Sequence, residues 1–267
     1  MNNASEAQIS YVRKHKKQQN FIQLARISTL FVFLLLWELS THFGIIDSFI
    51  FSSPSQIALC FWSMVLDRSI FLHIGITLYE TLFSFFLVTV LSLLFVILLW
   101  FSPSLSAIVE PFLVVLNSLP KSALAPLLIV WLGATQTTII VAGMSVAIFG
   151  CILNLYTSFS SVDPNSLKLI YTLGGNKFQT LCKVVIPSTI PAIISNMKVN
   201  IGLCLVGVII GEFLAAKSGL GYLIIYSSQV FKLDWLLMSI VLLCLIAMGL
   251  YWTLKTLENI INRPNKA

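Results

Sequence analysis

The sequence predicts an all-α membrane protein with about six transmembrane helices, and three observations lead to this prediction. Of its 267 residues, 58% are hydrophobic and 10% are charged, whereas soluble proteins carry roughly 25% charged residues. Apolar segments recur along the chain, and several are as long as the ~20 residues that cross a bilayer. The polar segments between them carry most of the lysines and arginines, as in multi-pass membrane proteins.

We expect membrane spans at residues 24–43, 73–101, 107–133, 137–157, 188–210 and 235–254. With both termini in the cytoplasm, the outer side holds only Arg68, Lys217 and Lys232. The basic residues assigned to the inner side are Arg13, Lys14, Lys16, Lys17, Arg26, Lys168, Lys177, Lys183, Lys198, Lys255, Arg263 and Lys266. This distribution obeys the positive-inside rule and places the polar segment 163–187 in the cytoplasm.

The predicted organisation is one transmembrane domain, residues 21–262, between a basic cytoplasmic tail at 1–20 and a short cytoplasmic tail at 263–267. Basic residues next to a span are typical topology signals, so we expect no nucleic-acid binding. A short segment, residues 56–66, follows the first span, and its apolar face fits the outer interface of the bilayer.

The third span is interrupted by polar residues and prolines in the run NSLPKSALAP, from Asn117 to Pro126. Proline frees backbone carbonyls, which a membrane tolerates only where protein or water covers them. This indicates the bundle interior or a conduction path. Lys121 either attracts an anionic substrate or reaches a carbonyl or glutamate partner.

Other polar residues in apolar segments mark the same interior, because ionisable groups inside spans tend to face a bundle or a wet cavity. Glu80 is such a group. Gly143 and Gly150 allow close helix packing. Glu212 either lines the pathway or pairs with Lys217. The candidate pathway residues are Asn117, Lys121, Asn154, Asn200 and Glu212.

The polar segment 163–187 predicts two short helices joined by a glycine elbow. Asp163 followed by Pro164 is typical of a helix start, and Gly174-Gly175 is typical of a helix end. We expect Leu167, Ile170, Tyr171 and Leu173 to share one side of the first helix. Phe178, Leu181, Val184 and Val185 should share one side of the second helix, which Pro187 ends. This apolar surface either contacts a soluble partner or rests on the lipid or on the protein's own bundle.

The same segment resembles the cytoplasmic EAA loop of ABC importer permeases. Gly174 is followed after nine residues by Val184-Val185-Ile186-Pro187, which resembles the second half of that motif, whereas Lys168-Leu169-Ile170 replace its acidic residue and two alanines. Three further phrases are similar to the nitrate, sulfonate and taurine group of these permeases: FSSPSQI at 51–57, residues 117–133 and GEFLAAKSGLGYLI at 211–224. Members of this group commonly carry Arg at the position of Glu80.

The resemblance implies a type I ABC importer permease fold in the bacterial cytoplasmic membrane. It also implies three kinds of protein partner: a pair of ABC ATPase subunits, a second permease chain, as in a homodimer, and an extracytoplasmic substrate-binding protein. The cargo would be a small sulfonate, nitrate or a heterocyclic vitamin precursor. The residues expected to couple the loop to the ATPase are Asp163, Leu167, Lys168, Tyr171, Gly174, Gly175, Lys177, Phe178 and Pro187.

The sequence does not predict an enzyme. It has no GxxxxGK[ST] phosphate-binding loop, so we expect ATP and magnesium on the partner ATPase and no cofactor on this chain. The five cysteines are scattered and show no metal-ligand spacing. The alternative function is a secondary transporter driven by an ion gradient, in which Glu80, Glu110, Glu212 and Lys121 carry the coupling charge.

Overall fold

The computed structural model describes residues 6–261, except for the side chains of residues 6–13, 16, 20, 27 and 261. The described part is helical throughout, with no strand. Its helices are α1 Glu6–His42, α2 Ser48–Phe51, α3 Pro54–Leu66, α4 Ser69–Phe101, α5 Pro103–Ser118, α6 Lys121–Leu132, α7 Gln136–Ser160, α8 Pro164–Thr172, α9 Lys177–Thr180, a π-helical turn Leu181–Val185, α10 Ile186–Ala215, α11 Leu220–Gln229 and α12 Leu233–Ile261.

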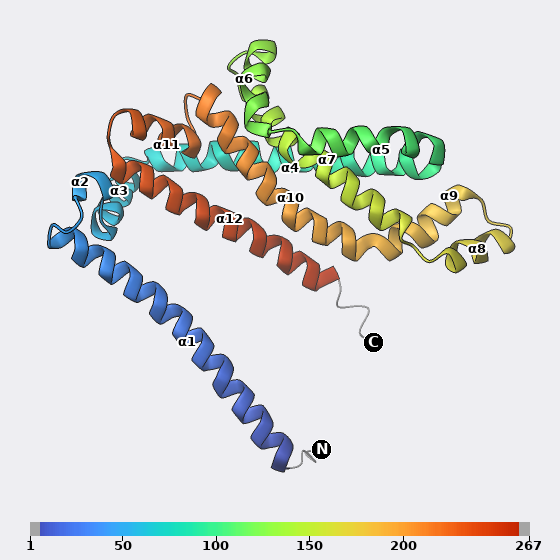
Figure 1. The fold of residues 1–267 in the computed structure, drawn as a ribbon, viewed down its shortest axis with the longest axis horizontal. Helices are drawn as coiled ribbons and strands as arrows, with labels where there is room; N and C mark the ends of the chain where they lie inside the picture. Colours follow the sequence, from blue (N-terminus) through green and yellow to red (C-terminus); the bar gives the residue numbers. More distant parts are fainter. Residues whose placement is uncertain (1–5, 262–267) are drawn as a thin grey trace. The chain divides into compact units, whose positions relative to one another are not determined.

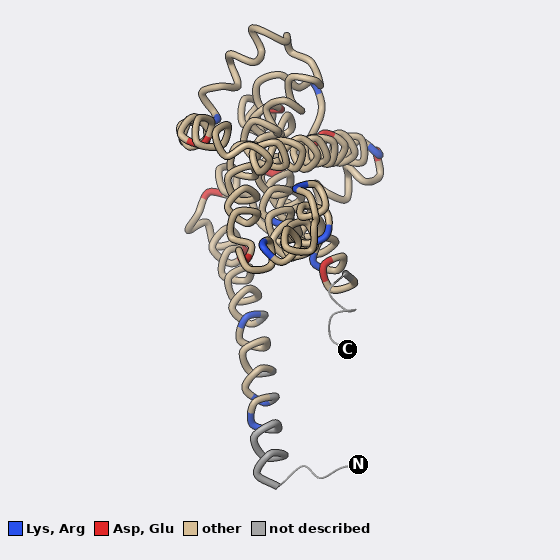
Figure 2. Tube along the Cα trace, turned by 90° about the vertical axis from the view of Figure 1, so that its right-hand side faces the viewer, with Lys and Arg blue, Asp and Glu red and all other residues tan. Residues whose placement is uncertain are grey.

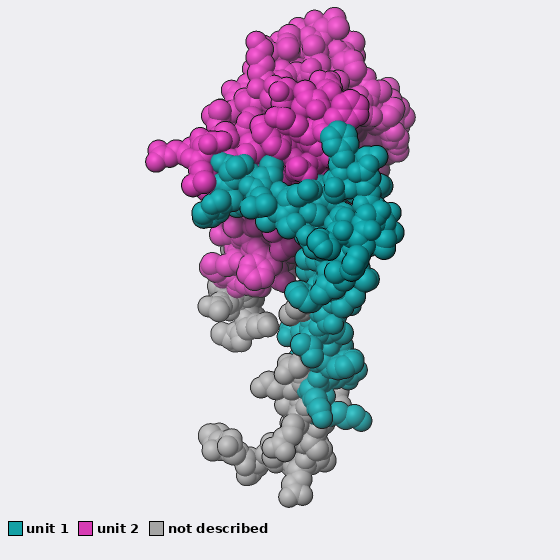
Figure 3. All heavy atoms as spheres, turned by 90° about the vertical axis from the view of Figure 1, so that its left-hand side faces the viewer, with its two compact units in different colours: residues 1–63 teal, residues 64–267 magenta. Residues whose placement is uncertain are grey.

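The chain forms two compact units, residues 1–63 and 64–267 (Figure 3). In the first unit the helix α1 begins at Glu6, within the predicted basic tail. Its Glu38 accepts hydrogen bonds from the backbone N–H (3.0 Å) and the hydroxyl (2.7 Å) of Ser55. Glu38 thereby caps the first turn of α3, which gives this carboxylate a local structural role. Residues 1–5 and 262–267, with Arg263, Lys266 and the predicted tail 263–267, lie outside the described residues.

Five described helical segments are long and apolar enough to cross a membrane, and a bent helix pair brings the number to six. The five are Lys17–His42, Ser69–Phe101, Gln136–Ser160, Lys177–Ala215 and Leu233–Ile260. Each overlaps one of the predicted spans, which confirms the predicted fold class. Most of the trace carries no charged residue (Figure 2).

The predicted third span is a broken one. Helices α5 and α6 meet at an angle of 96° across Leu119 and Pro120. Leu119 has extended backbone angles, as expected for a residue before proline. The expectation of a single interrupted span is therefore corrected to two helices with a sharp bend at Pro120.

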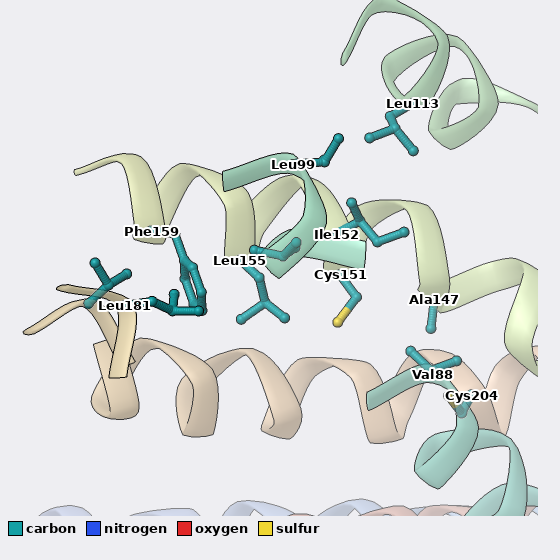
Figure 4. Close-up of a cluster of buried hydrophobic side chains, with 12 residues drawn as sticks. Val88, Leu99, Leu113, Ala147, Cys151, Ile152, Leu155, Phe159, Leu181 and Cys204 are labelled. Atoms are coloured by element: carbon teal, nitrogen blue, oxygen red, sulfur yellow. The ribbon is translucent and has the colours of Figure 1, made fainter. Parts of the chain in front are cut away.

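The core of the second unit lies where α7 packs along both α4 and α10 (Figure 1). Figure 4 shows Cys151, Leu155 and Phe159 of α7 pointing toward α10. The backbones of α7 and α10 are in close contact at Gly207, because a Cβ there would lie 2.8 Å from both the carbonyl oxygen of Ala142 and the Cα of Gly143. Small residues at this crossing allow the two backbones to touch, which confirms the packing role expected for Gly143.

The prediction that Pro187 ends a helix was wrong. The chain continues from α9 through the π-turn into α10 without a break. In the π-turn the N–H of Ile186 donates to the carbonyl of Leu181, five residues back, so the turn is one residue wider than an α-turn. Pro187 then stands in the first turn of α10, where a missing N–H has little cost.

Candidate functional site

The segment between α7 and α10 begins with a capped helix. Asp163 accepts hydrogen bonds from the backbone N–H of Asn165 (3.0 Å) and of Ser166 (3.2 Å), and from the hydroxyl of Ser166 (3.1 Å). These bonds, that of Asn165 foremost, lower the pKa of the Asp163 carboxyl. Pro164 occupies the first position of α8. The predicted start of this helix is confirmed.

The glycine elbow is a Schellman motif, a helix end closed by two backbone hydrogen bonds. Gly174 has φ +82°, which glycine adopts without the penalty of a side chain. Its N–H donates to the carbonyl of Tyr171 (3.0 Å), while the N–H of Gly175 donates to that of Ile170 (2.8 Å). These two bonds define the motif. The chain therefore leaves α8 in a fixed direction.

The second short helix, α9, is closed at its start by a capping box. The N–H of Gln179 donates to the side chain of Asn176 (2.8 Å), and the N–H of Asn176 donates to the side chain of Gln179 (2.9 Å). Both orphan donors are thus satisfied. Since α9 runs without a break into the π-turn and α10, it is a continuous extension of a membrane span.

One side of the loop is anchored in the core of the second unit. Leu181 and Val185 are buried in the cluster that contains Phe159 of α7, and Leu167 packs against its edge. The anchoring role of these residues agrees with the predicted apolar sides of the two helices.

The other side of the loop is open, and here two predictions needed correction. Phe178 was expected on the same side as Leu181 and Val185, but it is 64% exposed. Tyr171 and Leu173, expected beside Leu167, are also exposed, Leu173 by 76%. Lys168 and Lys177 are exposed as well. We call the side chains of Lys168, Leu169, Tyr171, Leu173, Lys177 and Phe178 the loop surface.

The predicted pathway residues fall into two groups. Asn117 and Asn154 are exposed and Lys121 is half-buried. The amide oxygen of Asn117 lies against Gly150, 3.2 Å from where a Cβ would stand, and Asn154 is one turn further along that face of α7. Asn117 and Asn154 therefore lie along one exposed face of α7, and Lys121 lies at the nearby bend between α5 and α6.

Lys121 is held locally. Its ammonium group donates a hydrogen bond to the carbonyl of Leu116 and lies 4.9 Å from the centre of the Phe149 ring. The sequence left two roles open for Lys121, attraction of an anionic substrate or a hydrogen bond to a carbonyl, and the structure shows the hydrogen bond.

Asn200 and Glu212 are buried at the packed face of α10. One turn before Asn200, the side-chain amide of Asn196 donates a hydrogen bond to the carbonyl of Cys151 in α7 (3.3 Å). These groups hold helices together and do not face an open path in this structure.

Glu212 organises the glycine-rich turn that precedes α11. It accepts hydrogen bonds from the hydroxyl of Thr77 (2.6 Å) and the N–H of Gly221 (2.5 Å). The pairing of Glu212 with Lys217 is wrong, because the ion pair found among residues 6–261 joins Lys198 to Glu258. Sequence reasoning missed Thr77. The spacing of Thr77, Glu80 and Ser84, polar positions three and four apart in an apolar helix, is the signal that marks this face of α4.

No metal-binding constellation is found in the described part of the chain. There, no three His, Cys, Asp or Glu side chains gather as they would around a metal ion. The geometry thus comprises an exposed surface at one end of the second unit (α8 and α9) and a closed polar cluster near α11 at the other end (Figure 1).

Comparison with known proteins gives a consistent result. Residues 89–263, more than half of the chain, match the family model of the binding-protein-dependent transport system inner membrane component. The formylaminopyrimidine transport permease protein ThiX of Halalkalibacterium halodurans is 28% identical, over 87% of this chain and 93% of ThiX. The taurine transport system permease protein TauC of Escherichia coli is 23% identical, over 87% of this chain and 86% of TauC.

Among solved structures, the crystal structure of an amino acid ABC transporter with histidines superposes with a TM-score of 0.60 at 19% identity. The superposition covers 76% of this chain and 98% of that one. This likeness extends to the fold alone. Together with the family match, it shows that the chain belongs to the binding-protein-dependent transport system inner membrane components, as a multi-pass ABC importer permease with the type I fold.

Proposed function

We propose that the chain is the membrane-spanning permease of an ATP-driven importer that moves a small anionic or heterocyclic solute across the bacterial cytoplasmic membrane by alternating access. Its partners are two ATPase subunits that bind the loop surface, a second copy of the permease and an external substrate-binding protein. The ATPase subunits bind and hydrolyse ATP with magnesium. Family membership supports this assignment.

The observation that carries the proposal is the loop surface. Leu173 and Phe178 expose 76% and 64% of their surface on two short helices between membrane spans. Large apolar side chains gathered at a polar, water-facing end of a membrane protein are typical of a binding site for another protein. Aromatic Tyr171 and Phe178 are well suited to fill a groove of such a partner.

The charges of the loop surface indicate the partner's chemistry. Lys168 and Lys177 flank the apolar residues, whereas the nearby acid, Asp163, is engaged as the cap of α8. The matching groove should therefore be apolar at its centre and acidic at its rim. An acidic rim on the partner would pair with Lys168, which stands where the family motif carries an acidic residue.

The connection from the loop to the spans supports transmission of motion. The unbroken continuation of α9 into α10, and the burial of Leu181 and Val185 beside Phe159 of α7, link the loop surface to both helices. Movement of the ATPase subunits would shift α7 and α10 together, as alternating access between two packed states requires.

The cargo class rests on the relatives. ThiX is named for a heterocyclic compound and TauC for a sulfonate. In this chain the amides of Asn117 and Asn154 can hydrogen-bond either class. Lys121 adds positive charge close to the same face.

The test is co-purification of the tagged full-length chain from its native membrane in mild detergent, followed by an ATPase assay. We expect a soluble ATPase in the eluate, lost when Leu173→Glu and Phe178→Glu are combined. The matched control is Phe231→Asp, which changes an equally exposed apolar residue (66%) outside the loop surface. A chain that purifies without an ATPase, or an ATPase retained by the double variant, would contradict the proposed function of this surface.

A further inference from the structure

Two glutamates face each other inside the second unit. Glu80 of α4 is 1% exposed and Glu212 of α10 is fully buried. The side chain of Thr77, one turn before Glu80 on the same face of α4, is hydrogen-bonded to Glu212 (2.6 Å), which places the two carboxyl groups at the same contact between α4 and α10. Two ionised carboxylates buried at one contact would repel each other strongly, because protein and lipid screen charge poorly.

Glu212 is held as a hydrogen-bond acceptor. Its two oxygens receive the hydroxyl of Thr77 and the N–H of Gly221. The Thr77 hydroxyl itself accepts the N–H of Leu220 (2.8 Å), so its own proton is directed at Glu212. The backbone fits closely around this carboxylate, since a Cβ on Gly221 would lie 2.7 Å from one of its oxygens.

Glu80 has no such donors. Both of its carboxylate oxygens are buried and have no hydrogen-bond donor among the described residues. Its polar neighbours are the carboxyl of Glu212 and the amide of Gln136. An ionised Glu80 would thus be a buried charge without an ion-pair partner among the described residues, which costs several kcal/mol.

The other titratable groups near this site do not supply a positive charge to Glu80. His73, on the same face of α4, has its Nδ1 within hydrogen-bond distance of both the backbone nitrogen (3.0 Å) and the carbonyl oxygen (3.1 Å) of Gly219, so this ring nitrogen is engaged by the turn before α11 and not by Glu80. Tyr222, at the start of α11, stacks on the His73 ring. Lys217 is exposed, and no ion pair to either glutamate is found in residues 6–261.

We propose that Glu80 and Glu212 share one bound proton, with Glu80 as the protonated donor and Glu212 as the carboxylate that accepts. A shared proton removes one charge and gives the orphaned Glu80 its missing hydrogen bond, as in other close carboxyl pairs. A metal ion fits less well. Hard cations need six or more oxygen ligands, whereas the oxygens of Glu212 are already engaged and no third acidic, His or Cys ligand is present among the described residues.

The proton also has a structural consequence. It joins α4 to the turn between α10 and α11, at the opposite end of α10 from the loop surface. Loss of the proton in alkaline solution would leave two facing charges and drive this junction apart. The site is therefore a proton-dependent latch between helices, and it does not depend on the proposed import function.

The direct test is infrared spectroscopy of the purified full-length chain in lipid nanodiscs at neutral pH. We expect the carbonyl stretch of a protonated, buried carboxylic acid, and we expect Glu80→Gln to remove it. Glu258→Gln is the matched control, because Glu258 forms an ion pair with Lys198 at 2.7 Å and lies outside the proposed carboxyl pair. No protonated-acid band in the natural protein, or a band that survives both Glu80→Gln and Glu212→Gln, overturns the proposal.

A second measurement covers the case in which a variant folds poorly. The melting temperature of the natural chain should fall by several degrees between neutral and alkaline pH. Glu80→Gln, whose amide can still donate to Glu212, should remove this fall, and Glu80→Met should do the same by removing the second charge. The fall should also be insensitive to replacing potassium by sodium. Two results overturn the shared proton. One is a fall in melting temperature in the Gln and Met variants as large as that of the natural chain, and the other is a higher melting temperature of the natural chain in either potassium or sodium.

Discussion

The ammonium group of Lys121 caps the carbonyl of Leu116. In an unbroken helix this carbonyl would accept the N–H of the residue four positions later, which is Pro120 and has none. The lysine thus satisfies the carbonyl that the proline leaves free, at the point where α5 and α6 diverge by 96°.

Lys121→Met should therefore destabilise the protein. Loss of the donor leaves the Leu116 carbonyl unsatisfied, which costs about 1–3 kcal/mol, and we expect the melting temperature in detergent to fall by a few degrees. Lys121→Arg should largely restore it. The control is Lys217→Met, which removes an exposed lysine. Equal melting temperatures for Lys121→Met and the natural chain would show that the lysine has no structural role here.

The elbow of the loop makes a prediction about coupling. Gly174 has φ +82° and open space around it, so Gly174→Asn should be tolerated. Gly174→Val should not, because a β-branched residue avoids positive φ. We expect Gly174→Val to insert normally but to lose solute uptake per ATP hydrolysed. Unchanged uptake in Gly174→Val would refute the role of the elbow as a lever.

The contact of α7 with α10 predicts a contrast between two glycines of one helix. Gly207→Ala places a methyl group 2.8 Å from the backbone of α7, and such overpacking typically costs about 1–3 kcal/mol. Gly202→Ala meets no atom within 4 Å and should be neutral or slightly stabilising. Thermal unfolding of both variants measures the contrast. If both behave alike, the helices are not in contact at Gly207.

The cap of α8 predicts both a mutational and a pH effect. Asp163→Ala should speed trypsin cleavage at Lys168 relative to Asp163→Asn, which keeps a capping oxygen. Because hydrogen bonds lower the pKa of Asp163, its contribution is complete above the unfolded value of about 3.9. It is lost only as the pH falls through the lower folded value. Cleavage rates of the Asp163→Asn variant and the natural chain should hence keep a constant ratio from neutral to mildly acidic pH.

The features that could be predicted from the sequence are those fixed by residues close together in the chain. The Asp163-Pro164 start and the Gly174 stop are local backbone chemistry, and the apolar spans follow from length and composition. The bend at Pro120 was visible as an interruption, but its angle depends on how α6 packs.

The parts that the sequence did not predict depend on contacts between distant residues. The Thr77–Glu212 bond joins positions 135 apart, and no local pattern favours it over Lys217. Phe178 was misplaced for a different reason. The helix α9 has only four residues before the π-turn changes the helical period, so a regular 3.6-residue spacing assigned its side chains to the wrong face. Pro187 was misread because proline commonly ends a helix, whereas here it stands in the first turn of α10.

The measurement that tests the central claim most directly is solute uptake into proteoliposomes that contain the full chain with its co-purified subunits. Taurine, nitrate and a formylaminopyrimidine would be supplied with their candidate binding proteins. We predict accumulation of one of them that requires ATP and persists when ionophores collapse the proton and sodium gradients. Accumulation by the chain alone, driven by an ion gradient without an ATPase, would contradict the importer assignment and favour a secondary transporter.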